Sequence, residues 1–136
     1  MTVLIDTNVL SELPRPRPNA GVLRWLEGQG GLVLSVISIE ELAYGVARTS
    51  PPMRRRLGKW LEELVAATDC TLDVTPAIAC ASGELRAARE ALGCRVAQAD
   101  MLIAATALVH GLPLATRNTR GFEGCGVVQV NPFGDS

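Results

Sequence analysis

The sequence begins with Met1-Thr2-Val3-Leu4-Ile5-Asp6-Thr7-Asn8, an apolar run that stops abruptly at three polar side chains. An unbroken apolar run of this length is typical of a parallel strand that is buried on both faces. We therefore predict a first strand over residues 2–5, with Asp6 directly after it. In open parallel sheets, ligands bind beyond the carboxyl ends of the strands, so the position of Asp6 indicates a functional role.

The rest of the chain alternates between short apolar runs and longer segments whose apolar residues recur at helical spacing. This alternation predicts an α/β fold with a central, mostly parallel sheet flanked by helices on both faces. The length suits a single domain over residues 1–136. Further strands are expected at residues 32–37, 71–74, 112–115 and 127–130, and helices at residues 9–13, after the cap Asn19, from Ser38, from Pro51, at residues 76–92 and at residues 97–110.

The composition excludes two classes of protein. Hydrophobic residues make up 48% of the chain and charged residues 20%, so the chain can form a core and is not disordered. The longest uncharged run, residues 101–116, is interrupted by Gly111 and Pro113 and is too short to span a membrane. Because the amino terminus lacks the basic flank of a signal peptide, we expect a cytoplasmic protein without membrane contact.

Three acidic residues are expected at the same edge of the sheet. Asp6 follows the first strand, Glu41 lies in the first turn of the helix after the second strand, and Asp100 lies near the start of the last long helix. Carboxylates that meet there repel one another unless a cation neutralises them or some of them bind protons. With one histidine and no CxxC pair in the chain, the ligands are hard oxygen atoms, which favour Mg²⁺ or Mn²⁺ over zinc.

Each acidic residue also has a purely structural interpretation. Asp6 suits a turn or a helix cap. Ser38 and Glu41 match the S-x-x-E capping box, and this motif taken alone favours Glu41 as a helix cap. Asp100 suits the positive end of a helix dipole. The functional interpretation depends on the conjunction of all three, and on the apolar neighbours of Asp100 in a helix that is otherwise short of charge.

Four segments carry a family resemblance. They are Met1–Leu10 with its aspartate, Ile39–Gly45 with the pattern E-L-x-x-G, Ala99–Ala107 with the pattern D-x-x-I-A-A-T-A, and Leu114–Glu123. Together they cover essentially the whole chain in order and resemble the PIN-domain ribonucleases, above all the VapC and FitB toxins of bacterial toxin–antitoxin pairs. The resemblance implies a PIN-like fold in which Asp6, Glu41 and Asp100 are catalytic metal ligands.

The resemblance also implies an activity and partners. Proteins of this kind are magnesium-dependent endoribonucleases that cut RNA, form homodimers and are inhibited by a cognate antitoxin, with larger toxin–antitoxin hetero-oligomers on DNA. At the fourth acidic position, relatives carry an aspartate where this chain has Asn118 or Gly121. Asn118 is therefore the fourth catalytic candidate, because its carbonyl oxygen can bind a metal or water. The missing charge favours one tightly held ion over two, and Glu123 suits either the site or a surface turn.

Other polar residues near these positions have expected supporting roles. Thr7, Asn8 and Thr116 are candidates for hydrogen bonds that fix the carboxylates. Arg117 and Arg120 follow the strand at residues 112–115. They suit contacts with RNA phosphates and solvated loop positions about equally.

Two other functions compete with the nuclease. An aspartate after an apolar strand also begins the haloacid-dehalogenase phosphatases, but these need a second acid where this chain has Asn8. They also need a lysine, and the only lysine, Lys59, lies in a predicted helix with a core-like pattern. The other alternative is a module that keeps the fold, binds RNA or protein, and has lost catalysis with its fourth acid.

Overall fold

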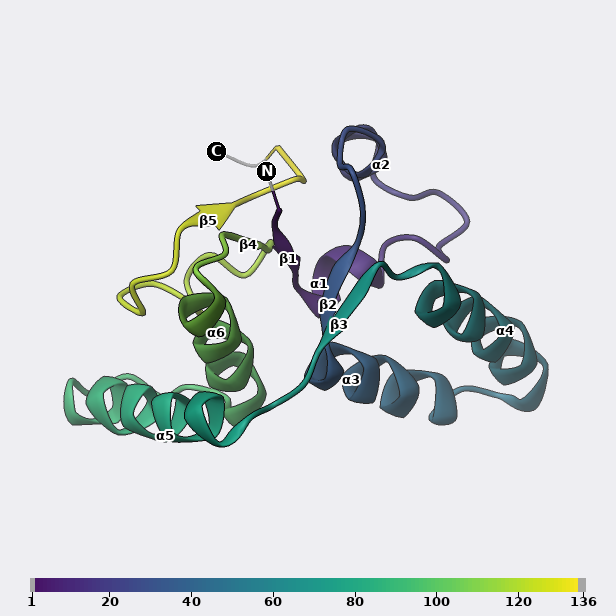
Figure 1. The fold of residues 1–136 in the computed structure, drawn as a ribbon. Coiled ribbons are helices and arrows are strands. Elements are labelled where there is room, and N and C mark those ends of the chain that lie inside the picture. The colour runs from purple at the N-terminus through teal and green to yellow at the C-terminus, as the bar shows by residue number, and fades with distance from the viewer. Residues whose placement is uncertain (1, 135–136) are drawn as a thin grey trace.

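The computed structural model of the protein describes residues 2–134 and contains a five-stranded sheet. Its strands are β1 (Leu4–Ile5), β2 (Val33–Ser35), β3 (Cys70–Leu72), β4 (Leu114–Ala115) and β5 (Gln129–Val130). The strand order is β3-β2-β1-β4-β5, and all neighbouring strands are parallel. The first strand therefore lies in the centre of the sheet, between β2 and β4 (Figure 1).

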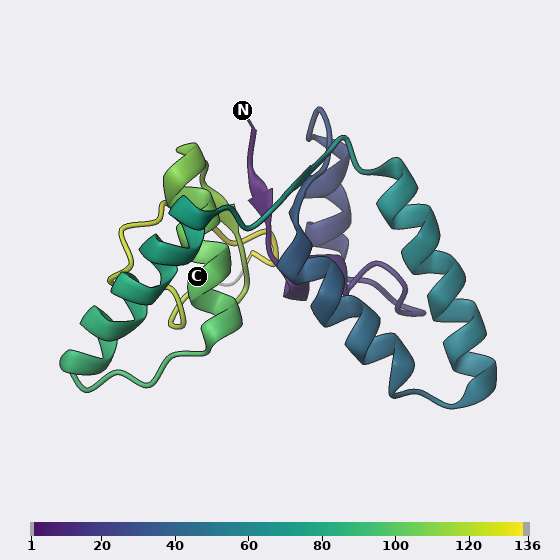
Figure 2. The ribbon, with the colours of Figure 1, turned by 60° about the horizontal axis from the view of Figure 1, so that its bottom comes forward.

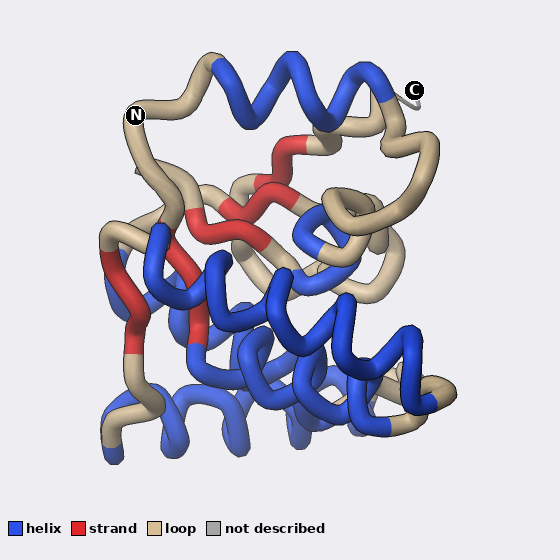
Figure 3. The backbone as a smooth tube through the Cα atoms, turned by 90° about the vertical axis from the view of Figure 1, so that its right-hand side faces the viewer, coloured by secondary structure: helices blue, strands red, loops and turns tan. Residues whose placement is uncertain are grey.

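Six helices surround this sheet. They are α1 (Thr7–Leu10), α2 (Ala20–Glu27), α3 (Val36–Ala47), α4 (Pro51–Ala67), α5 (Pro76–Ala91) and α6 (Gln98–His110). Helix α3 packs against α4, and α5 packs against α6. Figure 2 shows these two pairs as separate arms on either side of the first strand. Figure 3 shows the strands between α2 on one side and the longer helices on the other.

The two faces of the sheet belong to two hydrophobic clusters. Leu4 packs in one cluster with Met101 and Ile103 of α6. The next residue, Ile5, points to the opposite face and packs in the other cluster with Val9 of α1 and Val22 of α2. The predicted parallel sheet with helices on both faces is thus confirmed.

The predicted boundary between the second strand and α3 was wrong. The strand ends at Ser35, whose hydroxyl oxygen caps α3 by accepting a hydrogen bond of 3.0 Å from the backbone N–H of Ile37. Ser38 therefore lies inside the helix, and Glu41 falls in its second turn. The S-x-x-E motif is not a capping box here. The first helix also begins earlier than predicted, at Thr7, because Asp6 caps it.

Several predicted helix ends are confirmed. The side chain of Asn19 accepts from the backbone N–H groups of Gly21 and Val22 at the start of α2. Pro51 and Pro76 open α4 and α5. The last long helix ends at Gly111 in the left-handed conformation, with a φ of 65°. No helix in residues 2–134 has the length and apolar composition needed to cross a membrane.

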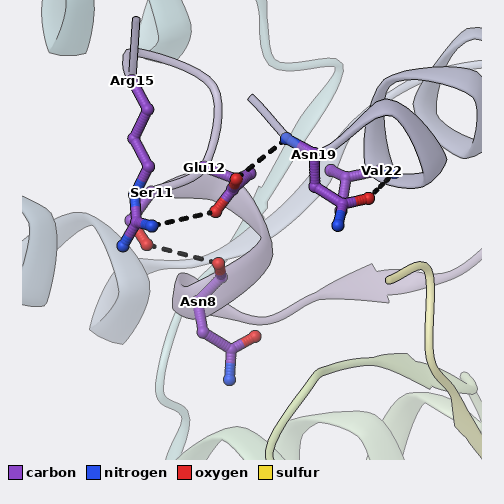
Figure 4. A network of polar contacts seen from close by, with 6 residues as sticks. All are labelled: Asn8, Ser11, Glu12, Arg15, Asn19 and Val22. Atoms are coloured by element: carbon purple, nitrogen blue, oxygen red, sulfur yellow. Dashed lines mark hydrogen bonds and ion pairs between the residues drawn. The ribbon is translucent and has the colours of Figure 1, made fainter. Parts of the chain in front are cut away.

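A buried carboxylate holds the loop between α1 and α2. Glu12 is 7% exposed, accepts from the backbone N–H of Asn19 at 2.8 Å, and forms an ion pair of 3.5 Å with Arg15 (Figure 4). Beside it, the hydroxyl of Ser11 donates to the carbonyl oxygen of Asn8 at 3.3 Å. These contacts fix the loop that follows α1, the helix that carries Thr7 and Asn8.

Candidate functional site

The centre of the sheet brings together two segments that are 110 residues apart. Because β1 and β4 are parallel neighbours, Asp6 and Thr116 leave the sheet side by side at its carboxyl edge. The hydroxyl of Thr116, which is fully buried, donates to Oδ2 of Asp6 at 2.8 Å. The first predicted acidic residue thus has a fixed partner from the far end of the chain.

Two further donors hold the carboxylate of Asp6. The backbone N–H of Thr7 donates to Oδ1 at 2.8 Å, and Nδ2 of Asn8 lies 3.2 Å from Oδ2. The side chain is only 4% exposed. Asp6 therefore is the helix cap that its position predicted, and the same contacts fix its orientation at the edge of the sheet.

The second predicted acidic residue reaches this edge from α3. The hydroxyl of Thr7 donates to Oε1 of Glu41 at 2.7 Å and lies 3.0 Å from Oγ of Ser38. Sequence reasoning assigned Ser38 to a helix cap and missed this contact. The signal was present, because residues three apart share one face of a helix and Ser38 is three residues before Glu41.

The third acidic residue contacts the loop after β4. Nδ2 of Asn118 donates to Oδ2 of Asp100 at 3.4 Å. The carbonyl oxygen of Asn118, which was expected to face a metal or water, accepts from the backbone N–H of Gly121 at 3.2 Å. The backbone N–H of Asn118 donates to Oγ1 of Thr116 at 2.9 Å. Asn118 thus presents its amide nitrogen, rather than its oxygen, to Asp100.

The carboxylates of this edge influence one another. Burial raises the pKa of Asp6 to about 6, against the lowering effect of its hydrogen bonds from Thr116 and Thr7. The negative charges of Asp100 and Glu41 contribute smaller parts of this increase. The pKa of Asp100 is also raised, first by burial and then by the charge of Glu41. The three predicted residues therefore form one electrostatic unit.

This unit is not a closed metal cage. In the part of the chain that the structure describes, no three His, Cys, Asp or Glu side chains stand close enough together to hold one ion directly. The available donors are carboxylate and hydroxyl oxygens, which suit Mg²⁺ or Mn²⁺. Because Mg²⁺ usually keeps several of its water molecules and binds one or two carboxylates, an open oxygen-lined edge fits this ion chemically.

The remaining predicted residues divide between two places. The backbone N–H of Arg117 donates to Oδ1 of Asn8 at 3.1 Å, and its guanidinium lies 4.6 Å from the ring centre of Phe133. Arg120 and Glu123 instead line a hollow beside Asp100. Arg89 on α5 and Arg95 between α5 and α6 also line this hollow, and they were not predicted because neither belongs to a recognisable motif.

Comparisons with known proteins identify relatives of this chain. The sequence profile of the PIN domain matches residues 3–125. The plasmid stability protein StbB of Pseudomonas syringae pv. tomato is 40% identical, over 96% of this chain and 98% of its own. The VapC ribonuclease Y4jK of Sinorhizobium fredii is 35% identical, over 96% of this chain and 97% of its own.

Solved structures have the same fold. FitAB bound to an IR36 DNA fragment superposes with a TM-score of 0.83 and 32% identity, over 99% of this chain and 98% of the other. A toxin–antitoxin complex from Klebsiella pneumoniae superposes with a TM-score of 0.76 and 26% identity, over 96% of this chain and 98% of the other.

Proposed function

Because this chain belongs to the PIN-domain family, we propose that it is a divalent-metal-dependent endoribonuclease and the toxin of a toxin–antitoxin pair. One observation carries the proposal. Asp6, Glu41 and Asp100 come from three distant segments to one edge of the sheet, where burial first, and then the charges of Asp100 and Glu41, raise the pKa of Asp6 to about 6. Burying mutually repelling carboxylates is unfavourable by itself, and a bound cation would remove that penalty.

Asp6, Glu41 and Asp100 would hold Mg²⁺, or Mn²⁺ in its place, partly through the water molecules of the ion. A bound ion of this kind activates a water molecule and stabilises the charge that develops on a phosphodiester. The protein holds the ligands in place. Thr116, Asn8 and the backbone N–H of Thr7 fix Asp6, and the hydroxyl of Thr7 fixes Glu41.

The loop after β4 favours one tightly held ion. A fourth carboxylate is missing at Asn118 and Gly121, and Asn118 uses its carbonyl oxygen within the loop. Its amide group donates to Asp100 at 3.4 Å and so orients that carboxylate. Asn118 is thus a positioning residue in this proposal, and a second ion would have to arrive with the RNA.

The partners follow from the relatives. We propose that a cognate antitoxin covers the acidic edge and inhibits the enzyme, because a solved neighbour is a toxin–antitoxin complex. FitAB is bound to DNA, which supports a toxin–antitoxin hetero-oligomer on DNA for this chain as well. The toxin itself would act on RNA in the cytoplasm as a homodimer.

A binding module without catalysis is the second candidate. Two observations favour it: the described residues form no three-ligand cage, and Asn118 replaces an acid. A phosphatase of the haloacid-dehalogenase type is not supported, because Asn8 donates to Asp6 where a second acid is needed, and Lys59 is exposed on α4.

The test is cleavage of a mixed cellular RNA pool by the purified protein, with Mg²⁺ and with a chelator. We expect cleavage that requires the metal and falls to the chelator background in Asp6→Ala and in Asp100→Ala. Glu27→Ala, prepared in the same way, removes an exposed carboxylate at the end of α2 and should cut like the unaltered protein. Undiminished cutting by either aspartate variant would reject the proposed site, and a folded protein that binds RNA without cutting it would favour the module.

A further inference from the structure

A cavity of about 410 Å³ opens beside the carboxylate cluster. It shares Asp100 and Asn118 with the candidate active site, and three of its other lining residues are Arg89, Arg95 and Arg120. Glu123 also lines it. The acidic edge and a group of three arginines are therefore immediate neighbours.

The three arginines of this cavity outnumber its two carboxylates, Asp100 and Glu123. Within residues 2–134, neither Arg89, Arg95 nor Arg120 has a carboxylate oxygen within 4.0 Å, although Glu123 lines the same cavity. Arg95 and Arg120 are exposed. Three guanidinium groups against two carboxylates leave an excess of positive charge in the cavity, which attracts an anion.

Arg89 is held in the wall of the cavity by its surroundings. Its Nη2 donates to Sγ of Cys94 at 3.3 Å, and its Nη1 lies so close to Gly124 that a Cβ atom there would clash with it. Its Nε is buried and has no hydrogen-bond partner in the described structure. Arg89 is thus a fixed residue in the wall of the cavity, and a guanidinium is the side chain best suited to bind carboxylates or phosphates.

The start of α6 adds a second positive feature to the same cavity. Val96 and Ala97 line it, and the backbone leaves Ala97 to enter this helix of 13 residues. Ala97 has no side chain that could cap the first backbone N–H groups. Uncapped N–H groups at the positive end of a helix favour anions, and phosphate above all.

We propose that this cavity binds a phosphate of the RNA strand next to the one that is cleaved. The inference rests on the proposed nuclease function, which places the cleaved phosphate at Asp6, Glu41 and Asp100. Because Asp100 borders both places, a strand that crosses the acidic edge presents its neighbouring phosphate to the arginines. A planar guanidinium matches two phosphate oxygens at once, so the cavity would fix the position of the strand relative to the carboxylates.

The test measures binding without cleavage. A fluorescein-labelled single-stranded RNA is titrated in chelator with the unaltered protein and with Arg95→Gln/Arg120→Gln, and its anisotropy gives Kd at several salt concentrations. We expect Kd to rise at least about fivefold, and the slope of log Kd against log salt to fall by about 0.7, because the cavity holds one phosphate and each phosphate contact on a single strand contributes about 0.7. The control Arg17→Gln/Arg55→Gln removes the same charge from exposed positions outside the cavity and should change Kd less than about twofold.

Three results would overturn the inference: equal losses in both double variants, no RNA binding by the unaltered protein, or binding of inorganic phosphate as tight as that of RNA. The last result would mean a site for free anions rather than for a strand. The nuclease proposal fails separately. If RNA binding depends on Arg95 and Arg120 but the protein cuts no RNA, the nuclease proposal is rejected and the phosphate site in the cavity is supported. If the protein cuts RNA but Arg95→Gln/Arg120→Gln binds it as tightly as the unaltered protein, the phosphate site is rejected and the nuclease proposal is supported.

Discussion

Asp6 and Asp100 have the same proposed role and very different surroundings. Asp6 is 4% exposed and receives three hydrogen bonds, from Thr7, Asn8 and Thr116. Asp100 is half-buried, and the structure gives it a single long contact of 3.4 Å with Asn118. One side of the acidic edge is therefore fixed before any ligand arrives, whereas the other side is open.

The difference has a physical origin in the fold. Asp6 lies between the central strand and the buried residue Thr116, so its neighbours are set by the sheet itself. Asp100 lies in the first turn of α6 and faces a loop and a cavity. A preformed ligand on one side and an adjustable one on the other suit a site that must bind an ion and still admit a bulky strand.

The largest effect on stability should come from removing the negative charge of Asp6, the residue on the fixed side of the acidic edge. The pKa of Asp6 is raised to about 6, so the metal-free native state binds its proton more tightly than the unfolded chain does. The native state then holds more protons between the usual carboxyl pKa and about 6, and the free energy of unfolding falls as the pH rises through that window. Asp6→Asn should raise that free energy near neutral pH by up to ~3 kcal/mol.

Urea unfolding in chelator at several pH values would measure this effect. The advantage of Asp6→Asn over the unaltered protein should vanish as the pH falls below the usual carboxyl range. Asp100→Asn serves as the comparison and should give a smaller gain, because the pKa of Asp100 is raised less. If Asp6→Asn is no more stable than the unaltered protein at neutral pH, the charged carboxylate of Asp6 does not destabilise the metal-free native state, and this explanation is wrong.

A smaller effect is expected when one hydrogen bond is removed from each side. Thr116→Val deletes the hydroxyl that donates to Asp6 and should weaken Mn²⁺ binding about 10- to 100-fold, as is usual for partners of metal ligands. Asn118→Ala deletes the long contact with Asp100 and should weaken binding less than about tenfold. Isothermal titration with Mn²⁺ measures both.

Thr106→Val is the matched control for Thr116→Val. Thr106 is also fully buried, but its hydroxyl donates to the carbonyl oxygen of Leu102 within α6 at 2.7 Å. The control should lose stability and keep its affinity for Mn²⁺. If Asn118→Ala weakened binding as much as Thr116→Val, the distinction between a fixed and an open side would be wrong.

The sequence predicted the fixed side of the site better than the open side. An apolar strand followed by Asp6 is a local pattern, and parallel pairing with β4 then places Thr116 beside it. The side-chain orientation of Asn118 depends on a turn with Gly121, which residue types alone do not specify. The arginines of the cavity lie on α5, in the segment between α5 and α6, and after β4, and no motif in the sequence relates them.

The error at α3 has a similar cause. Val36 and Ile37 are apolar and β-branched, so they continue the pattern of the strand. Ser38 begins an S-x-x-E motif, which is typical of a helix start. Both signals therefore placed the end of the strand and the start of the helix too late in the chain. In the structure, Ser35 ends the strand and caps the helix. The shift of three residues moves Glu41 into the second turn, where it meets Thr7 rather than the end of its own helix.

The smallest expected effect concerns the turn that holds the open side. A Cβ atom at Gly121 would overlap the side chain of Asn118, so Gly121→Ala should push this amide away from Asp100. Affinity for Mn²⁺ should fall about as much as in Asn118→Ala, and the double variant should show no further loss, because both changes remove one contact. Gly83→Ala on α5 meets no neighbour, so it should stabilise the helix by up to about 1 kcal/mol and leave Mn²⁺ binding unchanged. If the losses of Mn²⁺ affinity add up in the double variant, Gly121 affects ion binding independently of Asn118. The position of Asp100 would then depend on more contacts than its single hydrogen bond with Asn118.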